Sequence, residues 1–225
     1  SLWISNNPIA GETTGEGGRS YYRSDTVELK FRGQDSNNVD IMKTTYQVLG
    51  TVDKAGSMLG NAVTQGQQLP TDEYQLGDKE TRTIQLQADG NWTVKVHNYN
   101  KEGKLVTTNT VEVTRDITVP TITSFTRTAR TESTINVKVD NNEFGVSGQA
   151  TGGGYQYFLA STSKSTQASN TYQYTGLTDL TGYTLKVIVK DKAGNVSNEQ
   201  TLKTMSAGSK NFDYTGSIET FTVPD

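Results

Sequence analysis

Residues 177–197 have the sequence Leu177-Thr-Asp-Leu-Thr-Gly-Tyr183-Thr-Leu-Lys-Val-Ile-Val-Lys-Asp191-Lys-Ala-Gly-Asn195-Val-Ser. From Tyr183 onward apolar and polar residues alternate, and only Ile188 interrupts the polar face, which is typical of a half-buried strand. The next residues, Asp191 to Asn195, are turn formers whose side chains bond nearby backbone, with Gly194 suited to a positive φ. The stretch therefore predicts a strand, a tight turn and a second strand at the end of a β-sandwich domain.

A related arrangement occurs earlier, where a predicted turn at Asp89-Gly-Asn91 leads into the alternating run Trp92-Thr-Val94-Lys-Val96-His. The chain thus repeats one kind of module. Its 225 residues and 24.5 kDa exceed one sandwich domain, because domains typically contain about 100–150 residues. We expect one domain over 1–117, a second over 118–204, and over 205–225 a linker with the start of a further domain.

Composition and charge exclude several classes of protein. A net charge of −3, from 21 basic and 24 acidic residues, offers no electrostatic footprint for nucleic acid. No apolar run approaches the roughly 18–20 residues of a membrane span, and the first residues lack the pattern of a signal peptide, so we expect no membrane insertion. Because the chain starts at Ser1, we expect an excised fragment. The absence of cysteine excludes disulfides and thiolate metal sites.

Short alternating runs between turn signals predict an all-β chain, and mean hydropathy of −0.61 suits small two-layer β domains. In the first half the predicted strands lie at Val27–Phe31, Tyr46–Val48, Ile84–Ala88, Trp92–Val96 and Val111–Val113. In the second half they lie at Ile122–Phe125, Ile135–Val139, Tyr155–Leu159, Tyr172–Tyr174, Tyr183–Val189 and near Leu202. Each set is sufficient for an antiparallel β-sandwich.

Two connections stand out. Pro120 holds the chain extended where the first module runs into the second. Residues 50–80 form a connection of about thirty residues, where roughly 4–6 is the median, and excess loop is where function tends to lie.

The first module, with Tyr46-Gln-Val48, the Asp89 to Val96 segment and the exit Asp116-Ile-Thr-Val-Pro120, resembles the bacterial Ig-like domains of secreted and surface proteins. The second resembles the fibronectin type III form of the same superfamily, with Leu177 and Tyr183 at the positions of the tyrosine corner. The resemblance implies two tandem immunoglobulin-like antiparallel β-sandwiches, with a truncated C-terminal β segment over 212–224 similar to glycine-rich domains of Gram-positive surface proteins. It also implies an extracellular or cell-wall-associated setting.

The sequence offers little for catalysis, and we predict no catalytic residues and no cofactor. The single histidine, His97, lies on the outward phase of its strand and has no nucleophile motif beside it. A carboxylate pair for glycoside hydrolysis stays open, since 24 acidic residues offer many pairs. Calcium is the more serious candidate ion, with Asp116, Asp140 and Glu143 close in sequence, but neither nearby acidic loop matches an EF-hand, and we predict no metal site.

Aromatic residues are the remaining candidates for binding, because exposed rings stack on sugars or fill pockets of a partner. Trp92 and Tyr183 share the phase of core aliphatics and are assigned to packing. Trp3, Tyr21, Tyr22 and Tyr74 lie in or beside predicted loops. We take Tyr21, Tyr22 and Tyr74 as the candidate ligand-binding residues.

The leading hypothesis is a non-catalytic structural spacer and interaction module of a bacterial surface or secreted protein, which positions neighbouring domains of the same polypeptide. The alternative is an adhesin for a host protein, or a carbohydrate-binding module, that uses the 50–80 connection and the aromatic residues near the N-terminus. A hydrolytic domain is a third hypothesis, with few candidate bases to support it.

Overall fold

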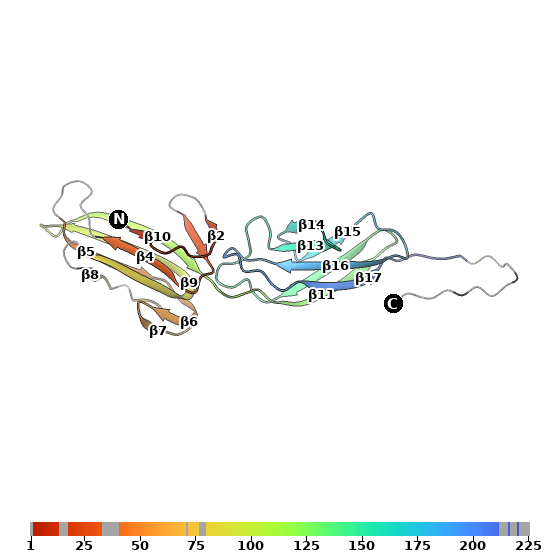
Figure 1. The fold of residues 1–225 in the computed structure, drawn as a ribbon, viewed down its shortest axis with the longest axis horizontal. Coiled ribbons are helices and arrows are strands. Elements are labelled where there is room, and N and C mark those ends of the chain that lie inside the picture. Colours follow the sequence, from red (N-terminus) through yellow and green to blue (C-terminus); the bar gives the residue numbers. More distant parts are fainter. Residues whose placement is uncertain are drawn as a thin grey trace. The chain divides into compact units, whose positions relative to one another are not determined.

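The computed structural model describes residues 2–13, 18–32, 41–70, 72–76, 80–211, 216 and 220, without the side chains of 41 and 42. The chain forms two compact units (Figure 1). Unit 1 comprises Ser1–Val119, Phe144–Ala150 and Asp191–Asn195, and unit 2 comprises Pro120–Glu143, Thr151–Lys190 and Val196–Asp225. Every regular element of the described residues is a strand, which confirms the all-β prediction.

Unit 1 contains ten strands joined in one hydrogen-bonded sheet. The strands are β1 (Leu2–Ile4), β2 (Ala10–Thr13), β3 (Arg19–Tyr22), β4 (Val27–Arg32), β5 (Ile41–Leu49), β6 (Val52–Met58), β7 (Asn61–Val63), β8 (Tyr74–Leu76), β9 (Thr81–Asn100) and β10 (Leu105–Arg115). The main path through the sheet is β1-β4-β9-β10-β3-β2, while β5 and β6 pair with the other edge of β9 and carry β8 and β7.

The long strand β9 organises unit 1. Its first half pairs with β4 and β6, and its second half pairs with β5 and β10. Because β9 pairs with different strands along its two halves, the sheet can fold over and enclose one core. The core side chains keep a single phase from Ile84 through Trp92 to Val96, and all three are buried. The predictions of two separate strands here and of a turn at Asp89-Gly-Asn91 were therefore wrong.

Trp92 explains why two glycines flank this part of the core. The Trp92 ring is fully buried, and its Nε1 donates to the Ala88 carbonyl at 3.0 Å. A Cβ on Gly90 would lie 2.4 Å from the indole ring. A Cβ on Gly50 would lie 2.7 Å from the same ring, and Gly50 has φ +147. The indole thus occupies space that only glycine leaves free, and its assignment to packing is confirmed.

The connection over residues 50–80 contains regular structure. It holds the β6–β7 hairpin and the short strand β8, and the hairpin extends from one side of unit 1 (Figure 1). Residues 71 and 77–79 lie outside the described residues. The prediction of a long loop here was wrong because the hairpin pairs with β9 and contributes Met58 and Val63 to the core.

Unit 2 is a sandwich, as predicted for the second module, and six of its seven strands coincide with the predicted ones; the exception is β14. The strands are β11 (Ile122–Arg130), β12 (Ile135–Asn141), β13 (Tyr155–Leu159), β14 (Thr162–Gln167), β15 (Thr171–Tyr174), β16 (Gly182–Val189) and β17 (Gln200–Met205). One sheet has the order β11-β12-β15 and the other β14-β13-β16-β17. The fourth strand of unit 2, β14, pairs with the third strand, β13. In a constant-type immunoglobulin domain, the fourth strand pairs with the fifth.

Tyr183 forms the predicted tyrosine corner. Its hydroxyl accepts a hydrogen bond from the Thr178 backbone N–H at 2.7 Å, so the ring ties β16 to the chain five residues upstream. Tyr183 is half-buried, while Leu185, Val187 and Val189 on the same strand are fully buried. Most of the predicted segment 212–224 lies outside the described residues.

Candidate functional site

The three candidate tyrosines do not lie together. Tyr21 and Tyr22 belong to β3, and Tyr74 belongs to β8. Three strands, β5, β9 and β10, lie between β8 and β3 along the hydrogen-bonded path of the sheet. Tyr22 is 8% exposed and part of the core, while the ammonium of Lys192 lies 5.5 Å from the Tyr21 ring centroid. Tyr74 is 40% exposed. A ligand-binding role for each of them stays a prediction.

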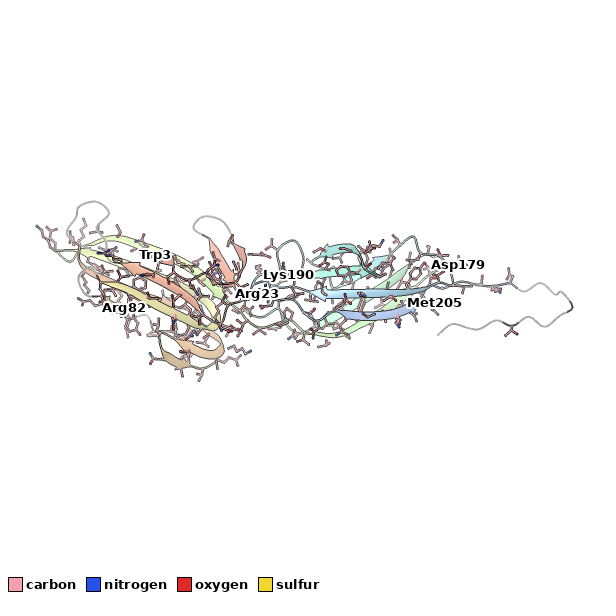
Figure 2. All side chains as sticks on the ribbon, viewed as in Figure 1. Trp3, Arg23, Arg82, Asp179, Lys190 and Met205 are labelled. Atoms are coloured by element: carbon pink, nitrogen blue, oxygen red, sulfur yellow. The ribbon has the colours of Figure 1, made fainter. Side chains whose placement is uncertain are left out.

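Trp3 lies on β1 and is 41% exposed, and Arg82 lies on β9 (Figure 2). Arg82 donates to Glu80 through Nε at 2.8 Å and Nη2 at 2.5 Å, so its charge is paired. Neither residue lines the pocket beside Tyr74.

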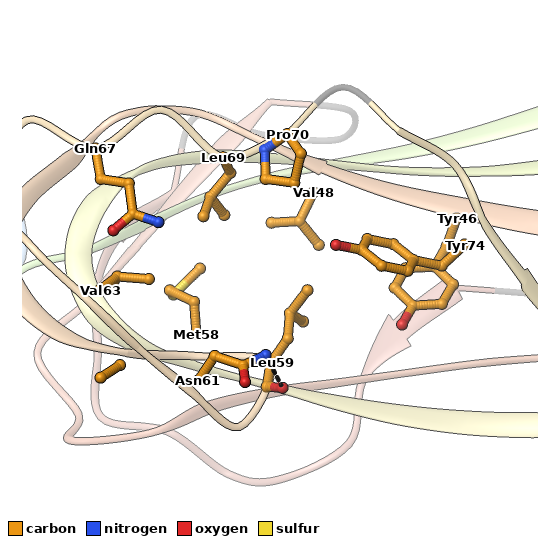
Figure 3. Close-up of a pocket in the computed structure, with 11 residues that line it drawn as sticks. Tyr46, Val48, Met58, Leu59, Asn61, Val63, Gln67, Leu69, Pro70 and Tyr74 are labelled. Carbon is orange, nitrogen blue, oxygen red and sulfur yellow. Dashed lines mark hydrogen bonds between the residues drawn. The ribbon is translucent and has the colours of Figure 1, made fainter.

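A pocket of about 290 Å³ lies beside Tyr74, between the β6–β7 hairpin and β5 (Figure 3). Its lining residues are Tyr46, Val48, Met58, Leu59, Asn61, Ala62, Val63, Gln67, Leu69, Pro70 and Tyr74. The lining has a buried apolar floor and an exposed rim that includes two side-chain amides, and none of the described lining residues is charged. All of these residues except Tyr46 and Val48 come from the 50–80 segment, the region predicted to carry function.

The rings of Tyr46 and Tyr74 form one end of the pocket (Figure 3). Their centroids lie 5.1 Å apart at an interplanar angle of 27°, so the exposed ring of Tyr74 stacks on the buried ring of Tyr46. Tyr46 in turn packs on Phe31 at 5.0 Å, and burial raises the pKa of its hydroxyl. This end of the pocket is therefore a stacked aromatic wall.

Leu59 forms part of the pocket and has an unusual backbone conformation. Met58 pairs with Asn61 across a two-residue turn, and both residues of the turn have positive φ, +54 at Leu59 and +80 at Gly60. This is the pattern of a type I′ hairpin turn, whose first position favours asparagine, aspartate or glycine. A left-handed leucine costs roughly 1–3 kcal/mol, and such strain clusters at functional sites.

Two amides lie on the rim of the pocket. Gln67 lies at the end opposite the tyrosine rings (Figure 3), and its Oε1 accepts from the Thr64 N–H at 3.0 Å. Asn61 donates through Nδ2 to the Leu59 carbonyl at 3.4 Å. These bonds orient both amides, so each can offer a fixed hydrogen-bonding edge to a ligand.

A second polar cluster in unit 1 is buried. Asp89, fully buried, accepts from Arg115 Nη1 at 2.6 Å, and Arg115 Nε donates to the carbonyls of Ser24 and Asp25 at 3.1 and 3.0 Å. The other oxygen of Asp89 accepts from the Thr118 hydroxyl at 3.0 Å. The cluster holds the end of β10 and the residues that follow it.

Asp116 extends this cluster. Its carboxylate accepts from the backbone N–H groups of Thr118 and Ser147, each at 2.9 Å, and its carbonyl accepts from the Asn195 amide at 2.9 Å. Asn195 also donates to Asp191 through its backbone N–H at 2.9 Å and its amide at 2.8 Å, which confirms the predicted turn. Burial raises the pKa of Asp191 to about 6.

The three carboxylates considered for calcium are divided between the two units. Asp116 is buried in unit 1, while Asp140 and Glu143 are exposed residues of unit 2. Over the described ranges, no group of three or more histidine, aspartate or glutamate side chains is placed to hold a metal ion. No described helix is long and apolar enough to cross a membrane.

His97 lies on the outer phase of β9, as predicted. Its Nδ1 lies 2.9 Å from the Thr108 hydroxyl, and its Nε2 lies 3.2 Å from the Gln47 side-chain oxygen. In a catalytic triad a carboxylate bonds the far ring nitrogen and stabilises the imidazolium. In this chain the ring nitrogen far from the Thr108 hydroxyl, Nε2, faces the neutral side-chain amide of Gln47.

No protein-family model matches the chain, and no curated protein matches it. Solved structures of tandem fibronectin type III segments are similar to it at low identity. The FN1–FN3 domains of chicken CNTN1 are 13% identical, with a TM-score of 0.39 over 89% of this chain and 68% of that one. The fibronectin(III)-like modules of Clostridium thermocellum CbhA are 12% identical, with a TM-score of 0.38 over 95% and 100%. A two-domain segment of chicken tenascin is 12% identical, with a TM-score of 0.34 over 92% and 98%.

Proposed function

We propose that this chain is a non-catalytic, load-bearing segment that sets the spacing between neighbouring domains of its own polypeptide. The observation that carries the proposal is the parallel pairing of β3 with β10, the last strand of unit 1 before Pro120. In this register Arg19 is opposite Glu112, and Tyr22 is opposite Arg115. Tension that enters at the start of β3 and leaves at the end of β10 therefore loads all the bonds of this pair at once, in shear.

The contacts around the exit of β10 support this role. The Asp116 N–H donates to the Tyr22 carbonyl at 2.9 Å, and Arg19 Nη1 donates to the Val113 carbonyl at 3.1 Å. The buried pair of Asp89 and Arg115 fixes the same strand end from the other side. A pull on the chain beyond β10 thus acts on a strand with backbone, side-chain and ionic attachments within unit 1.

The described strands of unit 2 contain no such pairing. Its first and last strands, β11 and β17, belong to different sheets. Side chains connect them, as where Arg127 donates to the Thr204 hydroxyl at 2.6 Å. We expect unit 2 to unfold at a lower force than unit 1.

Force spectroscopy on the full chain tests the proposal. Tyr22 directs its carbonyl toward β10, and because alternate residues of a strand face the same neighbour, Ser20 does so too. The N–H of a strand residue points to the same neighbour as its carbonyl, so the Ser20 N–H also faces β10. The Ser20→Pro variant removes this N–H, and we expect a lower unfolding force for unit 1 than in the Ser20→Ala control, which keeps it. The unfolding of unit 2 in the same molecules is the internal reference. Equal forces in the two variants would contradict the load-bearing role.

The extracellular setting is also part of the proposal, and it rests on the sequence resemblance to domains of secreted and surface proteins. The neighbouring domains of the same polypeptide are the proposed partners. The pocket beside Tyr74 favours a second function, recognition of a glycan or host protein by unit 1, because it gathers an aromatic wall and two oriented amides at one place.

A further inference from the structure

We propose that the pocket beside Tyr74 binds one uncharged pyranose ring of an oligosaccharide. This inference does not depend on the load-bearing role; it rests on the second function proposed above, glycan recognition by unit 1, and names the ligand class. Its basis is the match between the two faces of a sugar ring and the two parts of the pocket. A pyranose presents C–H groups on its faces and hydroxyls around its edge, and the pocket has an apolar floor beneath a polar rim.

The apolar part of the site is preformed. Val48, Met58 and Leu69 are buried in its floor, and the stacked rings of Tyr46 and Tyr74 close one end. A flat ligand face can pack on these groups without rearranging them, so little conformational entropy is lost on binding.

The polar part suits hydroxyl groups. Gln67 and Asn61 each use one side-chain atom in a bond to nearby backbone, which fixes the amide and turns it into a directional donor and acceptor. Pockets for small molecules usually combine an apolar lining with a few placed polar groups of this kind.

The size and charge of the site select the ligand further. A pocket of about 290 Å³ lies at the small end of the range for ligand sites, about 300–1,000 Å³, which suits a single sugar ring. None of the described lining residues is charged, and two charged side chains near the pocket are engaged elsewhere: Arg82 binds Glu80, and Glu73 accepts from Thr45 and Tyr99. A uronic acid would bring an unpaired carboxylate into this site, so the ligand is neutral.

Leu59 is the specificity element of this proposal. Asparagine or glycine would form its turn without strain, yet a leucine stands there and lines the pocket. Its replacement by asparagine relieves the backbone and at the same time removes an apolar wall from the site. Stability and binding are therefore expected to respond differently to the same substitution.

Isothermal titration of the full chain tests the proposal with cellohexaose, maltohexaose and chitohexaose as neutral probes, hexagalacturonate as the acidic probe and hexaproline as the peptide probe. We expect saturable binding of at least one neutral sugar. The Tyr74→Ala variant should weaken this binding about tenfold. The Trp3→Ala variant, which removes an equally exposed aromatic residue outside the pocket, should leave it unchanged.

Leu59→Asn is the second variant, and it should weaken sugar binding about tenfold while the urea midpoint of unit 1 does not fall, because relief of the left-handed backbone offsets the lost packing of Leu59 against the core. The proposal is overturned if no neutral probe binds at about 1 mM, if hexagalacturonate or hexaproline binds more tightly than every neutral sugar, or if neither Tyr74→Ala nor Leu59→Asn weakens binding.

Discussion

Removal of the Asp89 carboxylate should destabilise unit 1 more than any change to a surface charge. In the Asp89→Ala variant, Arg115, only 7% exposed at its side chain, keeps its charge and loses its ionic partner. Its Nε still reaches the carbonyls of Ser24 and Asp25, so the guanidinium stays in the interior and cannot move into water without breaking those bonds.

The expected cost follows from that geometry. Loss of one partner from a buried ion pair typically costs about 3–5 kcal/mol, because the remaining charge is uncompensated. With a urea dependence of about 2 kcal/mol per molar, the midpoint of unit 1 should fall by roughly 2 M. Both tryptophans, Trp3 and Trp92, belong to unit 1, so tryptophan fluorescence follows the unfolding of this unit alone.

A surface pair in the same unit provides the control. Arg19 and Glu112 lie 3.7 Å apart with side chains 21% and 43% exposed, so Glu112→Ala should cost less than about 1 kcal/mol. The double variant Asp89→Ala with Arg115→Met should be more stable than Asp89→Ala alone, since it removes the stranded charge. If the effects of the two substitutions simply add, the buried pair has no coupling and the reasoning fails.

Three further predictions concern the two cores and the Asp116 cluster. Trp92→Ala should destabilise unit 1 by about 3–5 kcal/mol and leave the calorimetric transition of unit 2 in place; loss of both transitions together would contradict two independent cores. Burial raises the pKa of the Asp191 carboxyl from 3.8 to about 6, so the folded state binds the proton of this group more tightly than the unfolded chain does. Protonation of Asp191 therefore contributes at most about 3 kcal/mol to the free energy of unfolding. This contribution is complete below pH 4 and is lost as the pH rises through 6. Asp191→Asn should flatten this part of the stability profile, and an unchanged profile would assign the pH dependence to another group. Gly145→Ala should destabilise more than Gly148→Ala in urea unfolding, because both lie in unit 1 and have positive φ but only the first would place a Cβ 2.5 Å from an Asp116 oxygen; equal effects would show that the backbone conformation alone matters.

The sequence predicted the strands whose residues alternate. Val27 to Phe31 and Tyr183 to Val189 each have a buried face that a period of two reveals. The pattern failed in β14, whose sequence Thr-Ser-Lys-Ser-Thr-Gln has no apolar residue, because this edge strand is held by backbone pairing with β13.

The failure at Asp89-Gly-Asn91 has a different cause. These residues favour a turn locally, but Asp89 is buried against Arg115, 26 residues away in sequence, and that partner cannot be recognised from local composition. Long-range burial therefore overrides the turn signal, and β9 continues through it.

The candidate site was predicted in part. The 50–80 segment and Tyr74 were selected, whereas the stacking partner Tyr46 was taken only as a strand residue. The separation of Tyr21 and Tyr22 from Tyr74 follows from the parallel pairing of β3 with β10, a contact between distant parts of the chain. One local signal was available in the sequence Leu59-Gly60-Asn61, which suits a tight hairpin turn. Leucine is an unfavourable residue for the first position of such a turn.

The direction of pulling tests the load-bearing account most directly. The chain has no cysteine, so Gly18→Cys and Arg23→Cys each provide a unique handle, at opposite ends of β3, with the second handle at the C-terminal end of the chain. Pulling from position 18 loads the β3–β10 pair in shear, and pulling from position 23 opens it one bond at a time. The account predicts a higher unfolding force for unit 1 from position 18, with the unit 2 event unchanged. An equal or lower force from position 18 would contradict it.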